Sequence, residues 1–140
     1  MTASLEITPE AQVQSKAITL PLGLLGFETV KRYQLLSDPN EAPFQWLQMG
    51  DDPNQGFLVL EPAFFIEDYA PQISDDDVRF LGLQDASDAL ILNIVTIRSG
   101  GKATANLKGP IVINRHTLSG KQVIPMNAAE LSVGYALPTQ

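Results

Sequence analysis

Carboxylates are the side chains of this chain most able to do chemistry. Twelve of them fall between residues 38 and 88, and three are consecutive: Asp75, Asp76 and Asp77. Such a group can bind a divalent cation, supply a general acid and base, or face a basic partner. The 140 residues include no cysteine and a single histidine, which excludes thiolate sites and a three-histidine zinc site.

The triple aspartate fits a helix start better than a cation site. A calcium loop needs spaced oxygens around a central glycine, and that spacing is absent. Ser74 followed by Asp77 three residues later matches a capping box, and acids in a first turn stabilise the helix dipole. We therefore predict one short helix near 75–81, ended by Gly82, and expect no metal and no cofactor.

Two other candidate sites are better explained by local structure. His116 has no carboxylate or nucleophile placed near it in the sequence, so we predict an exposed loop histidine. Gly23 and Gly26 are not followed by the Lys-Ser or Lys-Thr pair of a phosphate loop. We predict that these two glycines form a tight apolar turn.

The segment from Pro62 to Pro71 combines three aromatic residues with two acids. Two interpretations stay open. The segment can close one end of a barrel, or it can present aromatic anchors with an acidic rim to a partner protein. Stacking on nucleic-acid bases is disfavoured, because the segment holds no basic residue to bind phosphate.

Glycines and prolines divide the rest of the chain into short apolar pieces, which is typical of a sandwich or barrel. Leu90–Ile97 is apolar on both faces and predicts a central strand. We predict an all-β, small antiparallel β-barrel-like single domain over residues 1–140, with 1–12 and 138–140 loosely held. The predicted strands are Val13–Leu20, Tyr33–Leu36, Phe44–Met49, Phe57–Glu61, Leu90–Ile97, Lys102–Leu107, Ile111–Asn114 and Lys121–Ile124.

Charge and hydropathy narrow the class of partner. The net charge of −7 comes from the middle of the chain, and after residue 90 five cations face only Glu130. An acidic middle repels nucleic acid and favours a basic partner. No apolar run reaches the roughly 18 residues needed to span a bilayer, and no secretory signal pattern is present, so we expect a cytoplasmic protein with no membrane partner.

With these segments in order, the chain resembles the flagellar assembly factor FliW family over nearly its whole length. Two positions depart from the family pattern: Leu25 stands where proline is usual, and Met49 where serine is usual. The blocks that carry the resemblance are Gly23–Glu28, Pro43–Gln48, Pro62–Tyr69 with Leu81–Leu83, and Ile94–Ile97 followed by Ala103–Leu107 and Pro110–Asn114.

The resemblance implies a cytoplasmic protein-binding factor and not an enzyme. Members of the family bind the translational repressor CsrA, which then no longer silences flagellin message. They also bind flagellin, and the two partners compete, so that export of flagellin releases the factor to sequester CsrA. The resemblance implies no direct nucleic-acid binding.

CsrA-type regulators bind RNA and so need a basic surface, which an acidic surface would complement. We therefore expect seven residues to form the CsrA face: Phe65, Glu67, Asp68, Tyr69, Asp75, Asp76 and Asp77. Two alternatives stay open. One is a flagellin chaperone without a translational role, and the other is a small β-barrel enzyme that uses a carboxylate pair such as Glu67 and Asp75.

Overall fold

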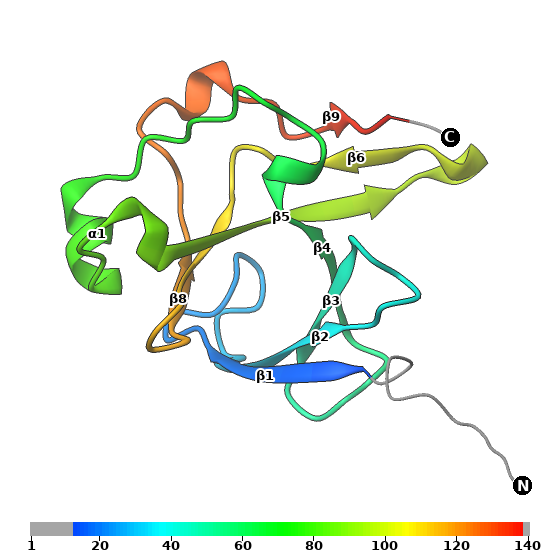
Figure 1. Ribbon diagram of the computed structural model, residues 1–140, viewed down its shortest axis with the longest axis horizontal. Coiled ribbons are helices and arrows are strands. Elements are labelled where there is room, and N and C mark those ends of the chain that lie inside the picture. Colours follow the sequence, from blue (N-terminus) through cyan, green and yellow to red (C-terminus); the bar gives the residue numbers. More distant parts are fainter. Residues whose placement is uncertain (1–12, 139–140) are drawn as a thin grey trace, which may run out of the picture.

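Nine antiparallel strands and one short α-helix make up the computed structural model, which describes residues 13–138 (Figure 1). The strands are hydrogen-bonded in the order β1-β2-β3-β4-β5-β6-β9, and β7 pairs with both β5 and β8. The predicted all-β class is confirmed. The strands are β1 (Gln14–Thr19), β2 (Arg32–Ser37), β3 (Gln45–Met49), β4 (Gly56–Leu60), β5 (Ala89–Ile97), β6 (Ala103–Ala105), β7 (Ile111–Asn114), β8 (Gly120–Gln122) and β9 (Tyr135–Ala136).

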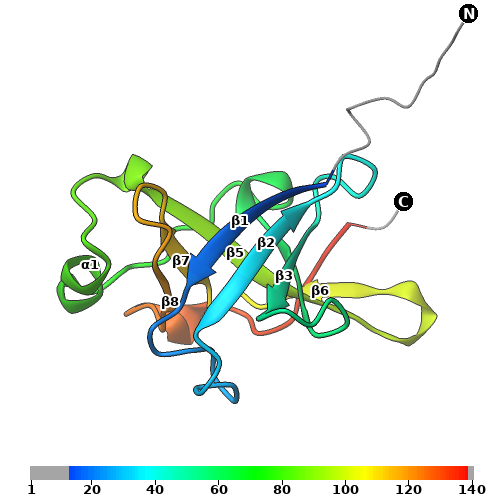
Figure 2. The same ribbon diagram turned by 90° about the horizontal axis from the view of Figure 1, so that it is seen from below.

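Strand β5 is the centre of the sheet, as its apolar sequence predicted. Its first half, from Ala89 to Leu92, pairs with β7, and its last three residues pair with β6. Its residues Asn93–Val95 pair with β4. A single strand therefore joins two parts of the sheet that diverge on either side of it, as Figure 2 shows from below.

The sheet curls without closing along its whole length, so its likeness to a barrel is loose. The end of β1 reaches the turn before β8, where the Thr19 N–H donates to the Leu118 carbonyl at 3.0 Å. This contact is an isolated bridge and not a ladder. The curl encloses the main apolar cluster, whose fully buried members include Ile18, Leu47 and Leu92.

Two smaller apolar clusters extend this core. One lies beneath the segment after β4 and is built on Leu60, Val95 and Leu137. The other packs the helix against the sheet through Leu81 and Val123. Burial of apolar area in these clusters is what holds the irregular segments to the strands.

The helix α1 (Asp75–Leu81) is confirmed together with both of its caps. The Ser74 hydroxyl accepts from the Asp77 N–H at 3.1 Å, and Gly82 ends the helix in the left-handed conformation. The second bond of the predicted capping box, from the Ser74 N–H to the Asp77 carboxylate, is replaced by another contact. The Asp77 carboxylate accepts from Lys121 Nζ, which brings β8 against the helix.

Three strand predictions differ from the structure near the C-terminal end. Strand β6 stops at Ala105 because the next residue, Asn106, accepts the N–H groups of Lys108 and Gly109 and turns the chain. Strand β8 is Gly120–Gln122 instead of Lys121–Ile124, and β9 was not predicted. The predictions for residues 1–12 and 139–140 lie outside the described residues, and the single-domain boundary stays a prediction. Within residues 13–138 no helix has the length and apolar character to cross a bilayer.

Only one of the two glycines of the predicted apolar turn is sterically required. Both have positive φ, 69° at Gly23 and 89° at Gly26. A Cβ at Gly23 would lie 2.5 Å from the Phe27 carbonyl oxygen, whereas one at Gly26 would meet nothing within 4 Å.

The same turn explains how Leu25 is accommodated, since its N–H donates to Gln122 Oε1 at 2.9 Å, a bond that proline cannot make.

The turn gives a matched pair of variants. We expect Gly23→Ala to lower the free energy of unfolding by about 3 kcal/mol, from the left-handed backbone and the backbone clash together. Gly26→Ala adds only the strain of a left-handed backbone and should lower the free energy of unfolding by about 1 kcal/mol. Urea unfolding at 25 °C measures both, and equal losses would contradict the role of the Phe27 carbonyl.

Candidate functional site

The predicted site residues lie on one stretch of chain, which runs from the end of the 3-10 turn η2 (Pro62–Phe64) into the first turn of α1. Figure 1 shows this segment in green, running along one side of the sheet. Asn127 fixes it from outside, because its Oδ1 accepts the Gln72 N–H at 2.9 Å and its Nδ2 donates to the Ala70 carbonyl at 3.1 Å. The segment is therefore a defined surface with its own hydrogen bonds to the fold.

Four of the five predicted acids are exposed along this segment. Among the ion pairs of residues 13–138, only Asp76 of these four takes part, with Arg79 one turn further along the helix. That pair is on the surface and contributes little to stability. We call the four exposed acids, Glu67, Asp68, Asp75 and Asp76, the acidic strip.

Asp77, the fifth acid, points into the fold. It is 8% exposed and pairs with Lys121 of β8, whose ammonium also lies 5.5 Å from the centre of the Phe80 ring. A buried, paired carboxylate is not available to a partner protein. Asp77 therefore docks α1 onto β8 and lies apart from the acidic strip.

Removing the cation of this pair should destabilise the fold. We expect Lys121→Met to lower the free energy of unfolding by about 1 to 2 kcal/mol, because it leaves the Asp77 carboxylate unpaired in a largely buried position. The matched control is Lys16→Met on the exposed face of β1, for which we expect a change below about 0.5 kcal/mol. Urea unfolding compares the two, and a loss no larger than that of the control would contradict this role.

The two predicted aromatic anchors also face inward. Phe65 packs against Tyr135 with ring centres 5.8 Å apart, and the Tyr69 hydroxyl donates to the Leu107 carbonyl at 2.7 Å. Burial raises the pKa of Tyr69, so its hydroxyl stays protonated as a donor. These two side chains are partly buried and pack against the apolar cluster of Leu60, Val95 and Leu137.

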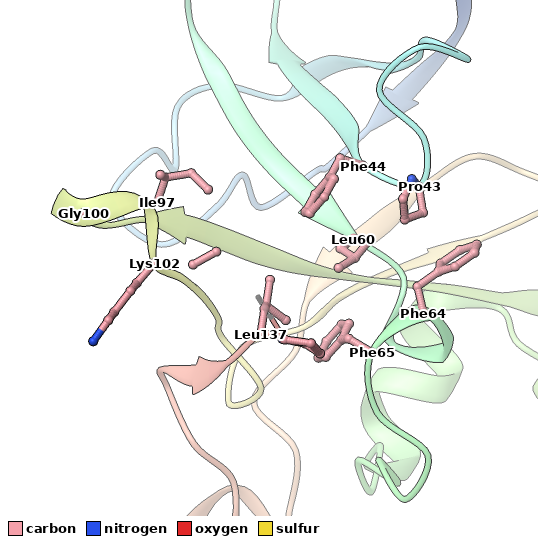
Figure 3. Close-up of a pocket in the computed structure, with 12 residues that line it drawn as sticks. Pro43, Phe44, Leu60, Phe64, Phe65, Ile97, Gly100, Lys102 and Leu137 are labelled. Atoms are coloured by element: carbon pink, nitrogen blue, oxygen red, sulfur yellow. The ribbon is translucent and has the colours of Figure 1, made fainter. Parts of the chain in front are cut away.

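The exposed aromatic residue of the segment is Phe64, which sequence reasoning missed. Its side chain is 60% exposed because the single 3-10 turn η2 directs Phe64 outward and the next residue inward. Phe64 borders a groove of about 810 Å³, which we call the aromatic groove (Figure 3). Its other lining residues include Pro43, Phe44, Leu60, Ile97, Lys102 and Leu137, and also Phe65, one of the predicted site residues.

His116 is exposed in a loop, as predicted, but it has a carboxylate partner 28 residues away. Its Nε2 lies 2.8 Å from Asp88 Oδ1. The Gln84 N–H, and then His116, lower the pKa of Asp88, while a hydrogen bond from Ser87 lowers that of Asp85. Carboxyl groups held in the ionised form cannot serve as proton donors near neutral pH, so neither aspartate of this cluster fits the role of a general acid.

The carboxylate pair Glu67 and Asp75, on which the enzyme alternative depends, does not lie in a cleft that could hold a substrate. Neither Glu67 nor Asp75 lines any of five grooves found among residues 13–138. A search of the same residues finds no group of three or more histidine, cysteine, aspartate or glutamate side chains able to hold a metal.

The asparagines of the segments Ala103–Leu107 and Pro110–Asn114, which carry part of the family resemblance, have structural roles. Asn106 Oδ1 accepts two backbone N–H groups in the turn after β6, and fully buried Asn93 donates to the Asn106 carbonyl at 2.9 Å. Asn114 donates to the Leu81 carbonyl at the end of α1 and accepts the His116 N–H at 2.8 Å. These segments thus specify turns and helix docking and supply no reactive group.

Comparison with known proteins gives one consistent result. The family model described as "FliW protein" matches residues 3–137. The flagellar assembly factor FliW of Leptospira biflexa is 42% identical over 116 residues, covering 81% of this chain and 76% of that protein. That of Natranaerobius thermophilus is 38% identical over 113 residues, covering 79% and 75%. The crystal structure of a flagellar assembly factor FliW superposes with a TM-score of 0.77 at 30% identity, covering 96% of this chain and 91% of that one.

Proposed function

This chain belongs to the FliW family of flagellar assembly factors, and from that membership we propose that it binds the translational regulator CsrA in the cytoplasm and relieves repression of flagellin synthesis. Flagellin binds the same factor in a competing complex. While flagellin accumulates, the factor is occupied and CsrA represses; once flagellin is exported, the factor sequesters CsrA. Family membership over residues 3–137 is the observation that carries this proposal.

The acidic strip supports the choice of a basic, RNA-binding partner. Glu67, Asp68, Asp75 and Asp76 are exposed on a segment that Asn127 holds in place, so their charges are presented with little ordering cost. Opposite potentials on two surfaces speed the encounter and favour the correct partner. We assign the CsrA contact to this strip, with Asp77, Phe65 and Tyr69 supporting it from inside the fold.

We propose a binding factor and not an enzyme, since the chemistry that the enzyme alternative needs has no support in the described residues. Asp85 and Asp88 are held ionised, and neither Glu67 nor Asp75 lines a well-formed groove. A flagellin chaperone without a translational role remains the second candidate. It needs only a surface for flagellin, which the family membership supports equally.

A pull-down from the lysate of a flagellated host distinguishes these functions. The tagged full chain should recover CsrA and flagellin in separate complexes, identified by mass spectrometry. Flagellin alone would favour the chaperone, whereas recovery of neither, from a lysate shown to contain both, would contradict the proposal. A chain in which the four acids of the strip are neutralised serves as the matched control and should lose CsrA selectively.

A further inference from the structure

The aromatic groove is a second surface, and no residue of the acidic strip lines it. Its floor is apolar and buried, formed by Leu60 and Leu137 of the core cluster beneath it. Phe64 rises on one side and Ile97, at the end of β5, on the other, 60% and 58% exposed (Figure 3). Large apolar side chains exposed on both sides of an apolar floor are typical of a surface that another molecule covers.

The ends of this surface carry opposite charge. Lys102 lies at the β5–β6 hairpin, where Figure 3 shows its ammonium pointing away from the other lining residues. In the other direction the groove continues past Phe44 and Phe64 into a second hollow, which both residues also line and to which Asp38 and Glu61 belong. An occupant that spans the two hollows would thus have the long, exposed Lys102 side chain beside one end and two carboxylates at the other.

The backbone on the β6 side of the groove favours an occupant that contributes side chains alone. Ile97 and Ala103 are partners in the β5–β6 ladder, and the Leu137 N–H donates to the Ala103 carbonyl. A bound strand would need unpaired backbone groups to add to the sheet, while a helix laid in a groove needs only apolar anchors. A helix also has a positive N-terminal end and a negative C-terminal end.

We propose that the aromatic groove binds an amphipathic α-helix of a partner protein, with the C-terminal turn of that helix at Lys102 and its N-terminal turn at Asp38 and Glu61. The occupant has an apolar face for Phe44, Phe64 and Ile97, acidic residues in its last turn and basic residues in its first. This assignment goes beyond the proposed function and does not depend on the identity of CsrA or flagellin as partners.

Two synthetic helical peptides test both the site and the orientation. They share leucines at positions i, i+3, i+4 and i+7, and one has lysines in the first turn and glutamates in the last, while the other has these charges exchanged. By fluorescence anisotropy with the full chain, the first peptide should bind about tenfold more tightly than the second. The variant Lys102→Glu should abolish or reverse that preference.

Variants of the walls locate the binding site. Phe64→Ala and Ile97→Ala should each weaken binding of the first peptide by about tenfold or more, since both remove exposed anchors. The control Leu25→Ala removes a side chain that is 80% exposed and outside the groove, and it should leave the affinity unchanged. All three positions are exposed enough that the fold should tolerate the change.

Several results would overturn the proposal. They are equal binding of the two peptides, binding that survives both wall substitutions, or no binding of either peptide at millimolar concentration. Sedimentation velocity adds one more: if the wild-type chain forms a dimer that Phe64→Ala dissociates, a second copy of the chain covers the groove instead of a partner helix.

Discussion

Neutralising the acidic strip is expected to slow association with CsrA by about tenfold to a hundredfold at low ionic strength, because complementary charge steers the encounter. The variant is Glu67→Gln, Asp68→Asn, Asp75→Asn and Asp76→Asn together. Its association rate should also depend less on salt than that of the wild-type chain. The free energy of unfolding should change by less than about 1 kcal/mol. Of the four acids, only Asp75 and Asp76 lie in the first turn of α1, where their charges stabilise the helix dipole.

The control for this variant removes the same charge elsewhere. Glu28→Gln, Glu41→Gln, Asp51→Asn and Asp52→Asn are four exposed positions outside the strip, and each amide keeps an acceptor oxygen. Stopped-flow or surface binding measurements compare the two quadruple variants over a salt series. If both slow association equally, net charge alone acts and the strip is not the CsrA surface.

The variant Asn114→Ala is expected to lower the free energy of unfolding by about 3 kcal/mol, because this buried amide makes hydrogen bonds to several parts of the fold. Asn114 is 4% exposed, and its amide joins three parts of the structure. It donates to the Leu81 carbonyl at the end of α1, and its Oδ1 accepts the N–H groups of His116 and Thr117. Alanine leaves the buried Leu81 carbonyl without this donor and removes the acceptor of two N–H groups in the loop after β7.

Urea unfolding at 25 °C measures the effect. The control is Asn40→Ala, an exposed asparagine in the loop after β2, for which we expect a change within about 0.5 kcal/mol. A loss at Asn114 no larger than at Asn40 would contradict the structural interpretation of the Pro110–Asn114 block. In that case the block would have to be explained by a binding role.

Local patterns were sufficient to predict most of the fold. Apolar runs between glycines and prolines located eight strands, and Ser74 with Gly82 set both ends of α1, because each signal acts over a few residues. The strand limits near Asn106 failed for a different reason. There a side-chain amide turns the chain, and the competing hydrogen bonds are not visible in the pattern of apolar residues.

The site was predicted less completely, because its contacts join distant parts of the chain. The run from Asp75 to Asp77 gave three equivalent acids, but the third is buried against Lys121, 44 residues later. Phe64 and Phe65 are neighbours of the same type, and only the 3-10 turn decides which of them is exposed. The aromatic groove brings together β4, the β5–β6 hairpin and the end of β9, which no local pattern could align.

The most direct test of the central claim is a gel-shift assay with purified CsrA, the leader of a flagellin message from the same organism, and this chain. We expect the chain to release the RNA from CsrA, and flagellin added in excess to restore the CsrA–RNA complex. The variant without the four charges of the acidic strip should release the RNA poorly. An intact CsrA–RNA complex in molar excess of the folded wild-type chain would contradict the account.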